Sequence, residues 1–312
     1  MALNAVFLFP GQGSQAIGMG EDFFKNSEVA RAMFQAAKEK SGIDFEELLF
    51  KENSNLEKTE YTQPAILLVS LVAQKLFENE LPIKPKYALG HSLGEISALA
   101  SVGAIDSVDA VDLVHKRGKF MAQACADKEV GMLVSLGLDD EVVEKLCEEA
   151  RSEGKQVWPV NYNTIGQIVI AGIKSDLSEL EPKLKEAGAR RAMLLNMSVA
   201  SHCPLLDSAV EPFKNELQKV IKDEFLAPVI SNVTAKPYSS KDEALELLPK
   251  QLVKPVLYKQ SIANIDDEVD CYIEFGHGNI LKGLNKKLTK KPHFNINNMA
   301  SLEATIKALE EL

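Results

Sequence analysis

The sequence has few cysteines, and their spacing excludes a disulfide scaffold and a paired-cysteine motif. The four cysteines among 312 residues are Cys125, Cys147, Cys203 and Cys271, and none forms a CxxC pair. Disulfide frameworks use many cysteines in a short chain, whereas these are widely spaced in a long one. We therefore expect reduced thiols and a cytoplasmic location.

Basic residues and long apolar runs are also scarce. Lys and Arg total 35 against 45 Asp and Glu, and the resulting net charge of −10 argues against a general nucleic-acid binder. The longest apolar stretch, near residues 65–73, is too short to span a bilayer. The first apolar run ends at Pro10-Gly11 without a basic segment before it, so we expect no signal peptide and no membrane partner.

The remaining composition is that of an ordinary globular chain. Hydrophobic residues make up 46% and charged residues 26% of the sequence. At ~150 residues per domain, the length indicates two domains or one large domain. One segment stands out for its charge, and it is either a solvated helix face or a docking surface for an acidic partner. Its lysines are Lys282, Lys286, Lys287, Lys290 and Lys291.

Strand-like and helix-like segments alternate over most of the chain. Residues 5–9 form a short continuous apolar run, which predicts a strand buried on both faces. Residues 86–89 predict a second strand, and later strands are expected at 229–231 and 271–275. Helices are expected up to about residue 40 and over 64–79, 95–101 and 107–124, the second of them opened by Pro64. The alternation predicts an α/β fold with a parallel sheet.

The segment from 131 to 197 has a different order. Strands are expected at 132–136, 157–160, 167–171 and 192–196, and helices at 139–153 and 177–187. The resulting βαββαβ order predicts a ferredoxin-like unit of about 70 residues. We therefore expect a discontinuous large α/β domain, 1–126 and 199–312, with a small domain inserted at 127–198.

The stretch GHSLGE, residues 90–95, carries the clearest chemical signal. It contains Gly-x-Ser-x-Gly between a predicted strand and a predicted helix. Such a turn lifts the serine Oγ clear of the sheet edge, and the two glycines permit the tight backbone path. The pattern predicts that Ser92 is a nucleophile and that the Leu93 N–H, at the helix start, faces a developing oxyanion.

A nucleophilic serine needs a base, and His202 is the first candidate among five histidines. It follows a predicted strand, precedes a helix and comes after the serine in chain order, as in the hydrolase arrangement. His277, in a glycine turn after a strand, stays a weaker candidate. No acidic residue suggests itself as a third member, and a backbone carbonyl could orient the imidazole equally well.

The first glycine turn, residues 11–16, satisfies GxGxxG/A literally. A dinucleotide site would need an acidic residue at the end of a second strand about 20 residues further on. Residues 29–40 read as a helix instead, which disfavours that interpretation. The alternative is that this turn supplies a second oxyanion N–H beside Ser92.

Arg117 lies on the apolar stripe of a predicted helix, in step with Val111, Val114 and Met121. A guanidinium on a buried face is costly unless it is paired. The sequence leaves two interpretations open. Arg117 either forms a structural ion pair or acts as a fork that binds a substrate carboxylate.

Seven motifs taken together resemble one family. GQGSQ, YTQPA, GHSLGE, HKRG, VNYNTIGQIVIAG, SVASHC and KQLVKPV occur in the order and spacing of the malonyl-CoA:acyl carrier protein transacylases of type II fatty acid synthesis. The resemblance covers essentially the whole chain. It implies a hydrolase-like α/β core with a ferredoxin-like insert. One departure is His277, which stands where relatives usually have proline in Gly-Pro-Gly.

The resemblance also implies residue roles. Ser92 would be the nucleophile, His202 the general base, and the backbone carbonyl of Gln251 the group that orients the imidazole. Gln12 and Leu93 would donate the oxyanion N–H groups. The implied substrate-binding residues are Arg117 for the malonyl carboxylate, Gln63 in the acyl pocket, and Asn163, Gln167 and Arg191 near the CoA or phosphopantetheine entrance.

The implied reaction is a ping-pong transfer. The malonyl group would pass from malonyl-CoA to Ser92 and then to the phosphopantetheine thiol of acyl carrier protein, without a metal or cofactor. A free-standing acyltransferase of a polyketide synthase (PKS) would share every motif. A serine esterase or thioesterase would share Ser92 and His202 but would not need Arg117. A non-catalytic scaffold would form no acyl adduct.

Overall fold

A mixed sheet forms the centre of the larger part of the molecule. The structure, a computed structural model, describes residues 3–195, 197 and 199–311. Within these residues, a six-stranded sheet has the order β10-β9-β1-β2-β7-β8. Its strands are β1 (Ala5–Phe9), β2 (Tyr87–Gly90), β7 (Val229–Ile230), β8 (Pro237–Tyr238), β9 (Cys271–Phe275) and β10 (His293–Ile296).

The central strand β1 is buried over its whole length, as its apolar run predicts. It pairs in parallel with β2, where Phe7 lies opposite Ala88, and with β9, where Phe7 lies opposite Ile273. The pairs β9–β10 and β2–β7 are also parallel. The sheet is nevertheless mixed, because β8 pairs antiparallel with β7. A turn as short as that between Ile230 and Pro237 can join only antiparallel neighbours.

Three helices carry several of the polar residues described below: α4 (Thr59–Glu80), α5 (Leu93–Ser101) and α6 (Ser107–Cys125). Phe77 of α4 meets Phe7 and Phe275 of the sheet, with ring centroids 5.9 and 5.5 Å apart. Pro64 lies inside α4 rather than at its start, which corrects the sequence-based boundary. The apolar pattern begins only at Pro64, whereas the helix begins at Thr59 with a largely polar turn.

A second, four-stranded sheet has the order β4-β5-β3-β6, with antiparallel pairing throughout. Its element order is the predicted βαββαβ. Its strand β3 buries Met132 against the large core and Leu133 against a separate small core, as the period of two requires. The predicted strand end at Asn196 lies outside the described residues. The elements are β3 (Val130–Leu136), α7 (Asp140–Ser152), β4 (Val157–Thr164), β5 (Gln167–Ile173), α8 (Lys174–Glu186) and β6 (Arg191–Leu195).

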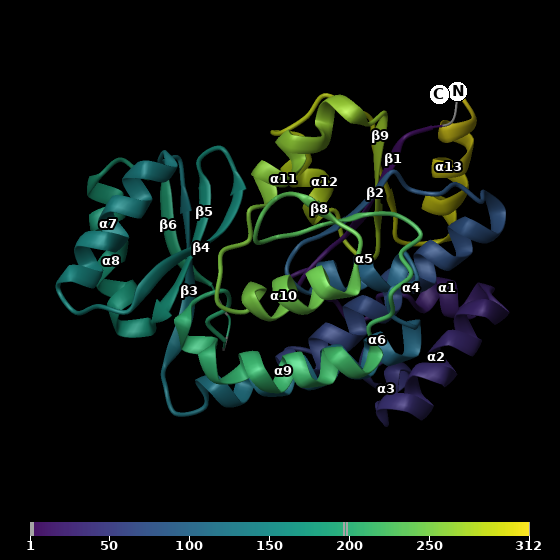
Figure 1. Cartoon of the computed structure of the whole chain (residues 1–312), viewed down its shortest axis with the longest axis horizontal. Coiled ribbons are helices and arrows are strands. Elements are labelled where there is room, and N and C mark those ends of the chain that lie inside the picture. The colour runs from purple at the N-terminus through teal and green to yellow at the C-terminus, as the bar shows by residue number, and fades with distance from the viewer. Residues whose placement is uncertain (1–2, 196, 198, 312) are drawn as a thin grey trace.

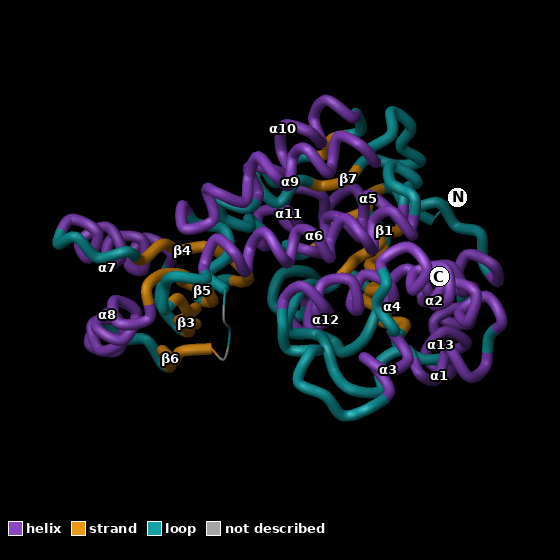
Figure 2. Tube along the Cα trace, turned by 90° about the horizontal axis from the view of Figure 1, so that it is seen from below, coloured by secondary structure: helices purple, strands orange, loops and turns teal. Residues whose placement is uncertain are grey.

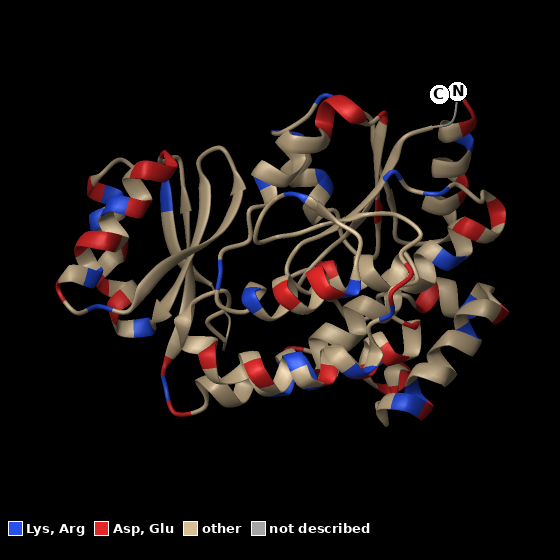
Figure 3. Ribbon diagram, viewed as in Figure 1, with Lys and Arg blue, Asp and Glu red and all other residues tan. Residues whose placement is uncertain are grey.

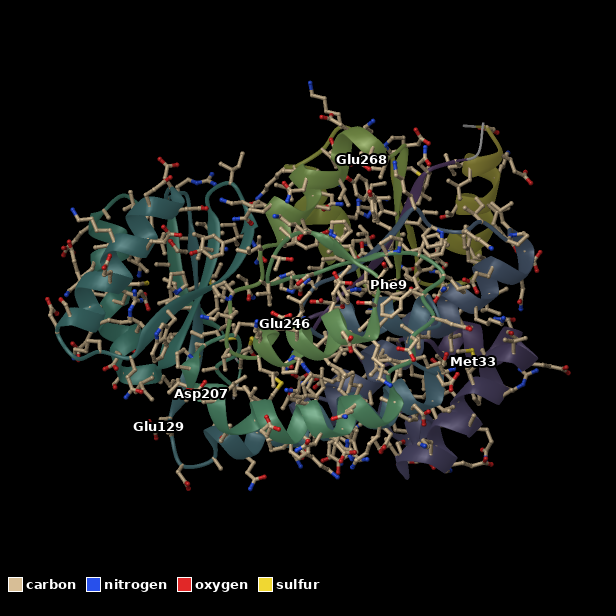
Figure 4. All side chains as sticks on the ribbon, viewed as in Figure 1. Phe9, Met33, Glu129, Asp207, Glu246 and Glu268 are labelled. Atoms are coloured by element: carbon tan, nitrogen blue, oxygen red, sulfur yellow. The ribbon has the colours of Figure 1, made fainter. Side chains whose placement is uncertain are left out.

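The two sheets lie side by side along the long axis of the molecule (Figure 1), and the view from below shows the small sheet with α7 and α8 as a lobe at one end (Figure 2). Glu129 and Asp207, labelled in Figure 4, lie near the junction between the lobes.

No helix in the described part of the chain is long and apolar enough to cross a membrane. The other helices are α1 (Glu21–Asn26), α2 (Glu28–Ser41), α3 (Phe45–Phe50), α9 (Asp207–Val220), α10 (Lys241–Gln251), α11 (Tyr258–Ile265), α12 (Ile280–Asn285), α13 (Met299–Glu310) and the short 3-10 turns Pro204–Leu206 and Asp266–Glu268.

Candidate active site

Ser92 occupies the tight turn between β2 and α5 that the glycine pattern predicts. Its backbone has φ 55° and ψ −111°, a conformation that is rare for a residue with a side chain. A Cβ at Gly90 would lie 1.8 Å from the Gly94 carbonyl carbon, and one at Gly94 would lie 2.0 Å from the Phe9 oxygen. Both glycines are therefore required by close backbone contacts that hold the serine at the end of the sheet.

Asn232, just beyond the neighbouring strand β7, secures this turn. Its Oδ1 accepts the Ser92 N–H at 2.7 Å, and its Nδ2 donates to the Gly90 carbonyl at 2.7 Å. Sequence reasoning missed this residue. The available signal was its position just beyond β7, because functional side chains gather at the carboxyl ends of parallel strands.

His202, the first candidate for the base, faces Ser92. Its Nε2 lies 2.8 Å from Ser92 Oγ, and its Nδ1 donates to the Gln251 carbonyl at 2.6 Å. Gln251 is the last residue of α10, where a helix leaves its carbonyl groups without intrahelical partners. This bond fixes the proton on Nδ1, so that Nε2 is free to accept the serine proton. His277 does not line the same pocket.

Burial keeps His202 neutral at rest. The side chain is almost fully buried, and this burial lowers its pKa to about 3. The Gln251 carbonyl opposes the shift, while the positive charge of Arg117 adds to it. A neutral imidazole at neutral pH is the form that can take a proton.

Arg117 reaches the same point from α6, and it is 1% exposed. Its Nη1 donates to Gln63 Oε1 at 2.7 Å and its Nη2 to Gln251 Oε1 at 3.0 Å. Nη2 also lies 3.5 Å from Ser92 Oγ. Among the described residues, the buried Nε has no partner. Burial lowers the pKa of Arg117 to about 10, so the guanidinium stays charged at neutral pH.

A cavity of about 260 Å³ opens above these residues. Leu93 is the first residue of α5, so its N–H has no intrahelical acceptor. Gln12 also lines the cavity, and its Oε1 accepts from Thr59 Oγ1 at 2.9 Å. Arg191 is exposed at the start of β6 and is not among the lining residues. The predicted residues that do line the cavity are Gln12, Gln63, Ser92, Leu93, Arg117, Asn163, Gln167 and His202.

The small sheet forms one wall of the cavity. Met132, Val134 and Val169 contribute apolar surface. Asn163 of β4 binds the ring of His91, with Oδ1 and Nε2 2.8 Å apart. The cavity therefore lies between the small sheet on one side and the turns and helices of the larger part of the molecule on the other.

The glycine turn at Gly11 packs against the serine turn rather than forming a separate site. A Cβ at Gly11 would lie 2.4 Å from the His91 carbonyl oxygen. This glycine therefore permits a close backbone approach to the turn that carries Ser92. In the described part of the chain, no group of three or more His, Cys, Asp or Glu side chains could hold a metal ion.

Glu95 of α5 is a second polar residue that sequence reasoning missed. It is fully buried, and its carboxylate accepts from Asn232, Gln251 and Tyr238. Its place in GHSLGE was visible, but its contacts come from two distant segments, the β7–β8 hairpin and the end of α10. The side chain of Gln251 also belongs to this group, since its Nε2 donates to the Ser92 carbonyl at 3.0 Å.

Comparison with known proteins supports one class for this fold and site. The family model described as "Acyl transferase domain" matches residues 6–305. The malonyl CoA-acyl carrier protein transacylase of Escherichia coli (strain K12) is 39% identical over 284 residues, which cover 90% of this chain and 92% of that protein.

Solved structures agree with this class. The malonyl-CoA:acyl carrier protein transacylase from Helicobacter pylori superposes with a TM-score of 0.96 at 44% identity, covering 99% of both chains. A type II PKS acyl-carrier protein in complex with its malonyl-transacylase contains a chain with a TM-score of 0.94 at 35% identity, covering 99% of this chain and 100% of that one. The chain belongs to the acyl transferase family and, within it, to the malonyl-CoA:acyl carrier protein transacylases.

Proposed function

We propose that this protein transfers the malonyl group from malonyl-CoA to the phosphopantetheine thiol of acyl carrier protein through a malonyl-serine intermediate. The malonyl-loaded carrier would then supply fatty acid elongation. The observation that carries the proposal is the position of Arg117. A buried guanidinium 3.5 Å from the Oγ of a histidine-paired serine suits an acyl group that has its own carboxylate. An esterase for neutral acyl groups has no use for that charge.

The first half-reaction forms the acyl-enzyme. His202 Nε2 takes the proton of Ser92 as Oγ attacks the thioester carbonyl carbon. The N–H groups of Gln12 and Leu93 stabilise the oxyanion of the tetrahedral intermediate. The carbon–sulfur bond then breaks, and the CoA sulfur leaves with the proton from His202.

The second half-reaction reverses the first with another thiol. The phosphopantetheine thiol gives its proton to His202 and attacks the malonyl-serine ester. The ester bond breaks, and Ser92 Oγ recovers the proton from His202. Arg117 holds the malonyl carboxylate in both halves. No step needs a metal or cofactor, so we propose that none is required.

Further residues would bind the two thiol carriers. Gln63 fixes Nη1 of Arg117 and would line the acyl pocket. Asn163 and Gln167, on the small-sheet wall, would lie along the entrance for CoA or phosphopantetheine. Arg191 is exposed and lies outside the cavity lining, so it would contact the carrier only at the rim of the cavity.

Two basic segments would dock the acidic carrier protein. One is the pair Arg190-Arg191, and the other is the lysine segment at 282–291, of which Lys282 lies on α12 (Figure 3). Leu281 and Leu284, on the same helix, line the cavity. A carrier bound there would stand beside the route to Ser92.

The fold supports a finer description that we also propose. The strand–serine–helix turn resembles that of hydrolases, and the β4-β5-β3-β6 order with two helices on one face is that expected of a ferredoxin-like unit. The domains would be 1–126 with 199–312, and 127–198. The four cysteines are free and buried, which supports a cytoplasmic location.

The proposal is tested by intact-mass measurement. We expect a malonyl adduct after mixing with malonyl-CoA, with none in Ser92→Ala, and parallel samples with acetyl-CoA and methylmalonyl-CoA measure acyl tolerance. Addition of carrier protein should discharge the adduct to the carrier faster than water does. Rapid hydrolysis without transfer would indicate an esterase, and the absence of any adduct would indicate a scaffold. Comparison of fatty-acid and PKS carriers decides which pathway the enzyme serves.

A further inference from the structure

Glu95 is a fully buried carboxyl group that the reaction steps do not use. Its Oε2 accepts from the Asn232 N–H at 3.0 Å and from Gln251 Nε2 at 2.7 Å. Its Oε1 accepts from the Tyr238 hydroxyl at 3.0 Å. All three partners are donors, and an ionised carboxylate, which only accepts, matches all three at once.

The Gln251 amide links this carboxylate to Arg117. Its Nε2 donates to Glu95, and its Oε1 accepts from Arg117 Nη2. Because a carboxylate can only accept, Glu95 turns the NH₂ end of the amide toward itself and the oxygen toward the guanidinium. A buried negative charge and a buried positive charge therefore lie on either side of one amide group.

The charges around this link are few. Two titratable side chains act on Glu95: the charge of Arg117, from α6, lowers its pKa, and the hydroxyl of Tyr238, from β8, donates a hydrogen bond to it. Tyr238 is neutral, since burial raises its pKa well above 10. The negative charge of Glu95 in turn raises the pKa of Arg117 against the effect of burial. Beyond Arg117, burial lowers the pKa of both His91 and His202, which keeps them uncharged.

We infer that Glu95 is the resident counter-ion of Arg117 and that it limits how tightly the site holds the acyl carboxylate. The inference rests on the proposed function, in which Arg117 binds that carboxylate. A second anion binds less strongly to a cation that already has one nearby, because the two anions repel each other in a dry site. Weaker binding of the carboxylate by Arg117 suits the reaction, because the malonyl group must leave the site on the carrier protein in every catalytic cycle.

The substitution Glu95→Gln isolates the charge. The new amide oxygen can accept from Asn232 and Gln251, and the new NH₂ can donate to the Tyr238 oxygen, whose hydroxyl rotates. The orientation of Gln251 is thereby kept while the negative charge is removed. Tyr238→Phe is the matched control, since it deletes one bond to the same carboxylate and leaves its charge in place.

The experiment compares binding of malonyl-CoA and acetyl-CoA, which differ by the carboxylate alone, in a Ser92→Ala background that cannot turn over. At pH 8, Glu95→Gln should tighten malonyl-CoA binding about tenfold and leave acetyl-CoA binding unchanged. Tyr238→Phe should leave the ratio of the two dissociation constants as it is. An unchanged or reduced preference for malonyl-CoA in Glu95→Gln overturns the inference.

A second readout needs no substitution at Glu95. Burial raises the pKa of Glu95 to about 7, so its charge appears as the pH rises from 6 to 8.5. Malonyl-CoA binding should weaken over this range relative to acetyl-CoA, and a flat ratio contradicts the counter-ion role. Failure of the proposed function looks different. In that case Arg117→Gln would not reduce the malonyl preference, whatever Glu95 does.

Discussion

Ser92 Oγ and His202 Nε2 lie 2.8 Å apart, although 110 positions separate the two residues in the chain. Both residues also have positive φ values, 55° and 63°. Strained backbone at both ends of one hydrogen bond indicates that the surrounding structure holds the pair in place before substrate arrives.

The first prediction concerns the pH dependence of this pair. Burial lowers the His202 pKa to about 3, so the imidazole is neutral and able to accept a proton throughout the range from pH 5 to 8. We expect a neutral fluorophosphonate to label Ser92 at a nearly constant rate from pH 5 to 8. The same measurement is made in the Glu95→Gln variant, so that ionisation of the nearby Glu95 does not contribute to the pH dependence of the labelling rate. A loss of rate centred near pH 6.5 would show an ordinary, solvated histidine instead.

The second prediction concerns acyl selectivity. Arg117→Gln should lower kcat/KM for malonyl-CoA about 100-fold, because a buried charge-assisted contact is lost. The rate of acylation by acetyl-CoA should not fall, since that substrate has no carboxylate. Lys119→Gln, on the exposed side of the same helix, is the control and should leave both rates unchanged. Equal loss with both substrates would assign Arg117 a purely structural role.

The third prediction concerns the serine turn. Gly94→Ala places a Cβ 2.0 Å from the Phe9 oxygen, a backbone atom that cannot swing away. We expect a loss of about 2 kcal/mol in the free energy of unfolding, with slower formation of the acyl-enzyme. Gly283→Ala on α12 is the matched control, because a Cβ there meets no atom within 4 Å. Chemical denaturation should find the control unchanged or more stable by up to about 1 kcal/mol.

The fourth prediction concerns the carrier protein. Charge reversal of the exposed lysines Lys286 and Lys287 should slow transfer from the malonyl-enzyme to carrier protein, most strongly at low salt. The first half-reaction with malonyl-CoA should change less. Lys307→Glu, exposed on α13, is the control for net charge. Carrier kinetics that are unchanged at all salt concentrations would remove this segment from the docking surface.

Much of the fold was predictable because burial leaves periodic traces in the sequence. The run at 5–9 and the βαββαβ order follow from apolar patterns of period two and 3.6. Strand β8 was not predictable, because two residues, Pro237 and Tyr238, carry no period. Because β8 pairs antiparallel with β7, the sheet is mixed, whereas the sequence predicted a parallel sheet.

The site was predictable where a residue type is unusual in its local context. Ser92 between glycines and Arg117 on an apolar stripe are such cases. Asn232 and Glu95 are not, because their contacts join segments more than 130 positions apart. The Gln251 carbonyl was expected only from the family resemblance, since every residue has a carbonyl and its position depends on where α10 ends.

The use of a main-chain atom to orient His202 has a consequence for genetics. No substitution at position 251, short of one that moves the end of α10, can delete the acceptor of the Nδ1 proton. A mutational scan of that position would record only what the side chain does for Arg117, Glu95 and the Ser92 carbonyl. Tolerance of substitution at 251 would therefore say nothing about how essential the imidazole's support is.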